Sequence, residues 1–215
     1  MNKLLFSLMV LAGVALPYAA NAGLLDGLKN TASTVGGSSD KSSSDSAGQQ
    51  DRLVAAYVAA NKDVLMAQYR MATALGVKDA AAKAKAEADA LGSGATKDNL
   101  AESDKVQSDV SKAIAERQND SSLKMDEAAK KEYAAGLALL GSGMLKYVGM
   151  KGELAAFQSS MSSFSPAVLT KLQSGMYVVS NFPQNSKNVY NTLSQANQFA
   201  KDRGIPVPED ATKAL

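Results

Sequence analysis

Two amino-acid types that carry much of enzyme chemistry are missing from this chain. Its 215 residues include no cysteine and no histidine. Without cysteine there is no disulfide bond, no thiol nucleophile and no thiolate metal ligand. Without histidine there is neither the commonest general base nor the commonest transition-metal ligand. These absences exclude Ser–His–Asp and Cys–His catalysis and the usual zinc sites. We therefore expect a protein that is not an enzyme, with no catalytic residues, no metal site and no cofactor.

An excess of charge of one sign is also lacking. The chain has 23 Lys and Arg against 21 Asp and Glu, a formal net charge of +2. This balance offers no electrostatic attraction for nucleic acid, so no nucleic-acid partner is expected. The charges are unevenly spread, because residues 133–203 hold only two acidic residues against six basic ones. That charge-poor part is either the buried core of a helical domain or an exposed surface that contacts a ligand, a partner or a membrane.

The N-terminus has the pattern of a cleavable export signal. A lysine at position 3 precedes an apolar run over residues 4–16, and Ala20-Asn21-Ala22 places small residues where a signal peptidase cuts. We expect cleavage after Ala22 and a periplasmic or secreted location. The apolar run is short for a membrane span, so no stable span is expected after cleavage. Residue 23 is Gly rather than Cys, which excludes lipoprotein attachment.

Composition divides the remainder into three parts. Residues 23–50 are predicted to be a short amphipathic stub followed by a Ser/Gly-rich flexible linker, because the linker has almost no apolar side chains to bury. Residues 51–204 are predicted to form a helical bundle domain, and residues 205–215 a Pro-bearing C-terminal tail.

Hydrophobic periodicity in residues 51–204 is helical throughout. Apolar residues recur every three or four positions over 51–75, and the Ala-, Lys- and Glu-rich segment 78–91 is expected to continue that helix as a solvated extension. No sustained alternation typical of strands is present. The pattern predicts an all-α fold, an elongated antiparallel helical bundle with long helices.

The most regular pattern is a coiled-coil-like seam of alternating three- and four-residue spacings over residues 133–164. Its members are Tyr133, Gly136, Leu140, Gly143, Tyr147, Met150, Leu154, Phe157, Met161 and Phe164. Glycines within this segment each cost about 1 kcal/mol of helix stability. They indicate either close approach of another helix or a break. Close approach is the favoured interpretation, because the seam keeps its phase across them.

Aromatic and sulfur-containing side chains on the charge-poor helices form the candidate ligand-binding set. Its members are Tyr147, Phe157, Met161, Phe164, Tyr177 and Tyr190. They are predicted to line a pocket or contact face between helices, or else to pack in the core with their phenols at its rim.

These features favour a non-enzymatic exported interaction or accessory protein with an envelope protein partner. Two alternatives remain open. One is a helical bundle that binds a small apolar molecule or lipid. The other is a membrane-active or pore-forming helical protein, suggested by the uncharged run over residues 134–145, although that run is too short to span a bilayer.

Overall fold

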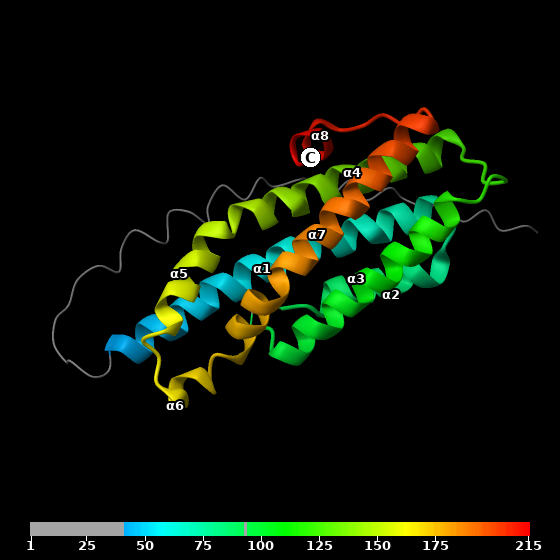
Figure 1. Ribbon diagram of the computed structural model, residues 1–215. Coiled ribbons are helices and arrows are strands. Elements are labelled where there is room, and N and C mark those ends of the chain that lie inside the picture. Colours follow the sequence, from blue (N-terminus) through cyan, green and yellow to red (C-terminus); the bar gives the residue numbers. More distant parts are fainter. Residues whose placement is uncertain (1–40, 93) are drawn as a thin grey trace, which may run out of the picture. The chain divides into compact units, whose positions relative to one another are not determined.

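The fold is a bundle of α-helices, as the periodicity predicts. The computed structural model describes residues 41–92 and 94–215, which belong to one unit, residues 38–215 (Figure 1). No strand occurs among these residues. The helices are α1 (Lys41–Ala74), α2 (Lys78–Ala90), α3 (Lys97–Gln118), α4 (Glu127–Gly149), α5 (Lys151–Met161), α6 (Pro166–Leu169), α7 (Gln173–Asp202) and α8 (Glu209–Lys213). The expected export signal and stub lie outside the described residues.

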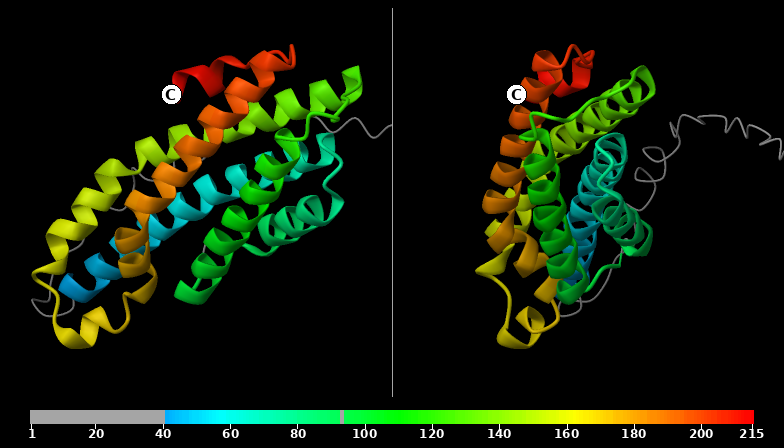
Figure 2. Two further views of the ribbon diagram at one scale, coloured as in Figure 1. Left: turned by 45° about the vertical axis from the view of Figure 1, so that its right-hand side comes forward. Right: turned by 90° about the vertical axis from the view of Figure 1, so that its right-hand side faces the viewer.

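Successive long helices run in opposite directions (Figure 1). Helix α1 packs most extensively on α4, and α7 packs on α3, α4 and α1. Helix α2 covers α1 and α3 on the side away from α7 (Figure 2). The core therefore lies around α1, which contacts helices on several sides.

The prediction that residues 78–91 extend the first helix is wrong. Gly76 has φ +75°, a conformation that glycine adopts readily, and it ends α1. Helix α2 then folds back onto α1 and α3. Its narrow alanine face is buried at Ala80, Ala81, Ala84 and Ala88. The alanines that suggested a solvated helix instead allow α2 to lie close to its neighbours.

Three glycines of α4 lie at close contacts, as the seam predicts. A Cβ on Gly136 would come within 2.9 Å of the Ala67 carbonyl oxygen of α1, and a Cβ on Gly143 within 2.9 Å of Val64. A Cβ on Gly141 would lie 2.6 Å from the backbone of α8 at Ala211. Close packing is therefore confirmed at these positions.

Gly149 and Gly152 show the second behaviour, a break. A Cβ at either position would meet nothing within 4 Å. Gly149 is the last residue of α4 and Gly152 is the second residue of α5, and Met150 separates the two helices. Although the helix is interrupted, Met150 and Phe157 remain buried. The seam thus keeps its apolar face across two separate helices.

Both ends of the described part are more ordered than composition suggests. Helix α1 begins at Lys41, so residues 41–50 of the expected linker are helical. The last residue of this stretch also makes a tertiary contact, because Gln50 accepts a hydrogen bond (3.1 Å) from the backbone N–H of Gly175 in α7. The expected tail includes α8, where Ala211 is fully buried and its carbonyl accepts a hydrogen bond from Asn197 (2.9 Å).

Two helices of very different length follow α5. The chain after Ser165 forms the short α6 and then the long α7. Pro183 lies inside α7, which continues past it to Asp202. Gly204, with φ +62°, follows the end of α7, in a conformation that glycine commonly adopts after a helix.

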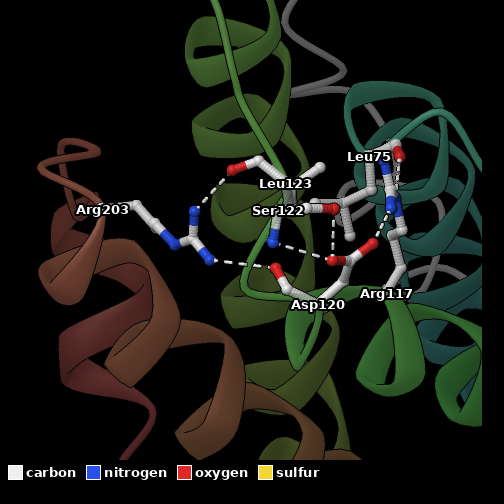
Figure 3. A network of polar contacts seen from close by, with 6 residues as sticks. All are labelled: Leu75, Arg117, Asp120, Ser122, Leu123 and Arg203. Carbon is white, nitrogen blue, oxygen red and sulfur yellow. Dashed lines mark hydrogen bonds and ion pairs between the residues drawn. The ribbon is translucent and has the colours of Figure 1, made fainter.

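The loop between α3 and α4 is held by two arginines (Figure 3). Arg117 pairs with Asp120 and donates to the carbonyl of Leu75 at the end of α1 (3.2 Å). Arg203, at the end of α7, donates to the carbonyl of Leu123 (2.7 Å). Hydrogen bonds from Ser122 hold the pKa of Asp120 below its usual range, with Arg117 adding to the effect. These contacts join the ends of α1, α3 and α7.

Candidate functional site

An apolar groove runs between α4 and α7. It has a volume of about 310 Å³ and is lined by Met144, Tyr147, Val148, Lys151, Phe182, Ser186, Lys187 and Tyr190. Tyr147 and Phe182 are buried and their ring centroids lie 5.8 Å apart. Val148 and Tyr190 are 44% and 41% exposed, which is unusual for side chains of this size in the described part. The groove thus combines buried aromatic rings with apolar side chains that water still reaches.

Two lysines are the charged members of this groove. Lys151 begins α5, and Lys187 lies in the middle of α7. Neither forms an ion pair with a residue of the described ranges, whereas the nearby Lys146 pairs with Asp63 at 2.7 Å. Among described residues the lining has no carboxylate. The groove therefore carries two positive charges without a protein counter-ion.

The candidate set divides between three places. Tyr147 and Tyr190 line the groove. Phe157 is fully buried, with its ring 6.1 Å from that of Phe164, while Met161 and Phe164 are partly buried against the core. Tyr177 instead hydrogen-bonds to Asp104. The six residues do not form one pocket.

The phenol of Tyr177 joins a polar cluster around Asp104 of α3. The carboxylate accepts hydrogen bonds from the phenols of Tyr57 (2.8 Å) and Tyr177 (2.6 Å). It also accepts from the amides of Asn61 (3.1 Å) and Asn185 (2.6 Å). The donors come from α1 and α7, so one side chain links three helices.

Electrostatics in the cluster are dominated by burial. Loss of hydration raises the pKa of the Asp104 carboxyl, although the four donors pull it in the opposite direction. Burial also raises the pKa of Tyr57, Tyr147 and Tyr177 well above the usual phenol range. The phenols therefore stay protonated as donors. Asp104 accepts from Tyr57 and Tyr177, whereas the side-chain oxygen of Asn61 accepts from Tyr147. The hydrogen-bonding capacity of the Asp104 carboxylate is therefore taken up by side chains of the protein.

A second groove, about 260 Å³, lies beside Asp104 between α3 and α7, with α1 beneath it. Amides and hydroxyls line it. Gln68 reaches across to α3, donating to the Gln107 carbonyl and to Ser111 (both 2.8 Å). The hydroxyl oxygen of Ser111 lies 3.3 Å from that of Thr192 in α7, within hydrogen-bonding distance. This groove is a polar helix–helix contact. The titratable groups of its described lining are Asp104, which the cluster engages, and Lys112.

The described residues contain no group of three or more Asp or Glu side chains placed to hold a metal ion. Within the same ranges, no helix combines the length and the apolar character needed to cross a bilayer. The α4–α7 groove is therefore the site with the clearest binding chemistry.

Sequence reasoning missed most of the groove. Met144, Val148 and the two lysines line it but do not belong to the candidate set. Two features of the sequence point toward these residues. Val148 and Lys151 lie three positions apart, and Lys187 lies in the charge-poor part of the chain. Sequence spacing could not show that α5 and α7 bring Lys151 and Lys187 to one groove.

Comparison with protein-family models, with curated proteins and with solved structures gave no match. The fold and groove place the chain in the broad class of helical bundles with a surface groove.

Proposed function

We propose that this protein is a non-enzymatic binding protein that holds a small apolar ligand in the α4–α7 groove. The observation that carries the proposal is the combination of a buried aromatic floor with exposed Val148 and Tyr190 at its edge. Burying apolar surface is the main source of affinity for such a ligand, at about 0.8 kcal/mol per CH₂ group. An alkyl chain is the simplest ligand that supplies such CH₂ groups.

A neutral ligand tests this function without the influence of charge. Calorimetric titration of the protein with decanol is expected to show saturable binding. Val148→Asn removes apolar surface from the groove wall, and we expect it to weaken binding about fivefold, which corresponds to about 1 kcal/mol. Leu145→Asn is the matched control, because Leu145 is similarly exposed on α4 but does not line the groove. Absence of alkyl-chain binding, or equal effects of the two variants, would contradict the proposal.

The same face supports a second function, contact with an envelope protein. Leu145, Val148 and Tyr190 are large apolar side chains that remain exposed on α4 and α7. A photoreactive residue at position 145 is expected to give a discrete crosslinked adduct in cells. The same residue in place of the exposed Lys105 of α3 is the control. Equal, diffuse labelling from both positions would argue against a specific partner.

We also propose that the protein acts outside the cytoplasm after cleavage at Ala22. The apolar run and small-residue site of the sequence support this. N-terminal sequencing of protein from a periplasmic extract is expected to begin at Gly23. A chain that still begins at Met1 and fractionates with the cytoplasm would refute it.

A further inference from the structure

We propose that the ligand of the α4–α7 groove is an anionic amphiphile, with its alkyl chain in the groove and its head group between Lys151 and Lys187. The inference rests on the proposed function and adds the chemical class of the ligand. It commits to a single dissolved amphiphile, such as a medium-chain carboxylate, as the occupant.

The first observation is the placement of the two lysines. Lys151 and Lys187 come from different helices, α5 and α7, yet both line one groove of about 310 Å³. Neither has an acidic partner in the described part of the chain, where several other lysines do, such as Lys105 with Asp109 at 2.9 Å. Two ammonium groups that line one groove from different helices complement a single negatively charged head group.

The second observation is the charge around them. Lys151 and Lys187 are the charged residues of the lining. The nearest acid along α5, Glu153, pairs with Arg52 of α1 at 3.7 Å. In the sequence between residues 154 and 200, Lys171 and Lys187 are the only charged side chains. The local potential is therefore positive, which favours an anion and opposes a cationic amphiphile.

The third observation concerns polar donors at the rim. Tyr190 is 41% exposed, and its phenol makes no hydrogen bond to any described residue. Ser186 beside it donates to the carbonyl of Pro183 (3.1 Å). Tyr190 is thus a free donor close to Lys187 on the same helix, and its donor complements the oxygen atoms of a carboxylate.

A series of ligands with one chain length isolates the head group. We expect decanoate to bind the full chain about tenfold more tightly than decanol at low salt, and decyltrimethylammonium to bind more weakly than decanol. The preference for decanoate is expected to shrink at high salt, because these lysines are solvent-accessible.

Variants that remove one positive charge test whether Lys151 and Lys187 bind the head group. Lys151→Gln and Lys187→Gln are each expected to weaken decanoate binding about threefold, and the double variant to abolish its preference over decanol. Decanol binding by each variant is the reference, because damage to the groove as a whole would weaken both ligands alike. Lys171→Gln is the matched control, because it removes the same charge from the same charge-poor part but outside the groove.

The outcomes separate this inference from the function on which it rests. Equal affinity for decanol and decanoate, or a decanoate preference that survives in the double variant, overturns the anionic head group and leaves the apolar site intact. No binding of any of the three ligands overturns both. Binding to vesicles of anionic phospholipid without binding of decanoate also overturns the inference, because it would assign the lysines to a membrane surface.

Discussion

Alanine substitutions at two glycines of the same apolar seam are expected to have opposite effects on stability. Gly136→Ala adds a methyl group where α1 and α4 touch. Its Cβ would lie 2.7 Å from Met71 Cγ and 2.9 Å from the Ala67 carbonyl oxygen. The Met71 side chain can rotate, but the Ala67 oxygen belongs to the backbone. The two helices must therefore move apart.

The size of the effect follows from two opposing terms. Overpacking of this kind costs about 1–3 kcal/mol, and replacing glycine by alanine in a helix returns up to about 1 kcal/mol. We expect a net loss of about 1–2 kcal/mol in the free energy of unfolding. For a domain of this size that corresponds to a melting temperature lower by about 2–8 °C.

Gly152→Ala provides the contrast. Nothing lies within 4 Å of a Cβ at this exposed position of α5. The gain in helix propensity is therefore unopposed, and stability should rise by about 0.5–1 kcal/mol. Urea and thermal unfolding followed by far-UV circular dichroism would measure both variants. If Gly136→Ala were as stable as Gly152→Ala, the close approach of α1 and α4 at Gly136 would be refuted.

Further predictions concern α8, the Asp104 cluster and the α4–α7 groove. Gly141→Ala should displace α8, since the added Cβ would lie 2.6 Å from the backbone at Ala211. Faster amide hydrogen exchange in residues 205–215 would show this displacement, and unchanged exchange would contradict it. Asp104→Asn should destabilise the protein by about 1–3 kcal/mol at neutral pH, because it replaces one of the two oxygens that accept from α1 and α7 by an NH₂ donor. Chemical denaturation measures this loss, and a neutral effect would mean that the cluster adds nothing to stability. Because burial raises the folded-state pKa of Asp104, this carboxyl contributes most to stability below its unfolded pKa and loses that contribution as pH rises through its folded pKa. The stability difference between wild type and Asp104→Asn should therefore grow as pH is lowered, and a difference that shrinks on acidification would reverse the assigned direction. Finally, lengthening an alkanoate ligand should strengthen binding roughly fourfold per methylene until the groove is filled; titration of a chain-length series with no such trend would argue against an alkyl-chain site.

The helical character of the chain was predictable, and so was its central seam. Positions Tyr133, Leu140, Tyr147 and Phe157 are all fully buried, as their spacing requires. Local periodicity suffices here, because a helix that buries one face must repeat apolar residues at about 3.6-residue spacing. The same logic could not separate Gly136 from Gly152, since their difference depends on which helix lies opposite.

The candidate site was predicted only in part. Tyr147 and Tyr190 reach the groove, whereas Phe157 packs in the core and Tyr177 bonds to Asp104. Side chains that share a helix face need not share a pocket, because the break at Met150 and the start of α7 at Gln173 set which faces meet.

The sequence by itself determined the all-helical fold, the apolar seam and the exclusion of histidine and cysteine chemistry, because composition and local periodicity are properties of the chain alone. Only the tertiary structure decided that α2 folds back at Gly76, that Asp104 joins three helices and that Lys151 and Lys187 line one groove. These features depend on contacts between residues far apart in the chain. Such contacts follow from how the helices pack, which no single segment specifies.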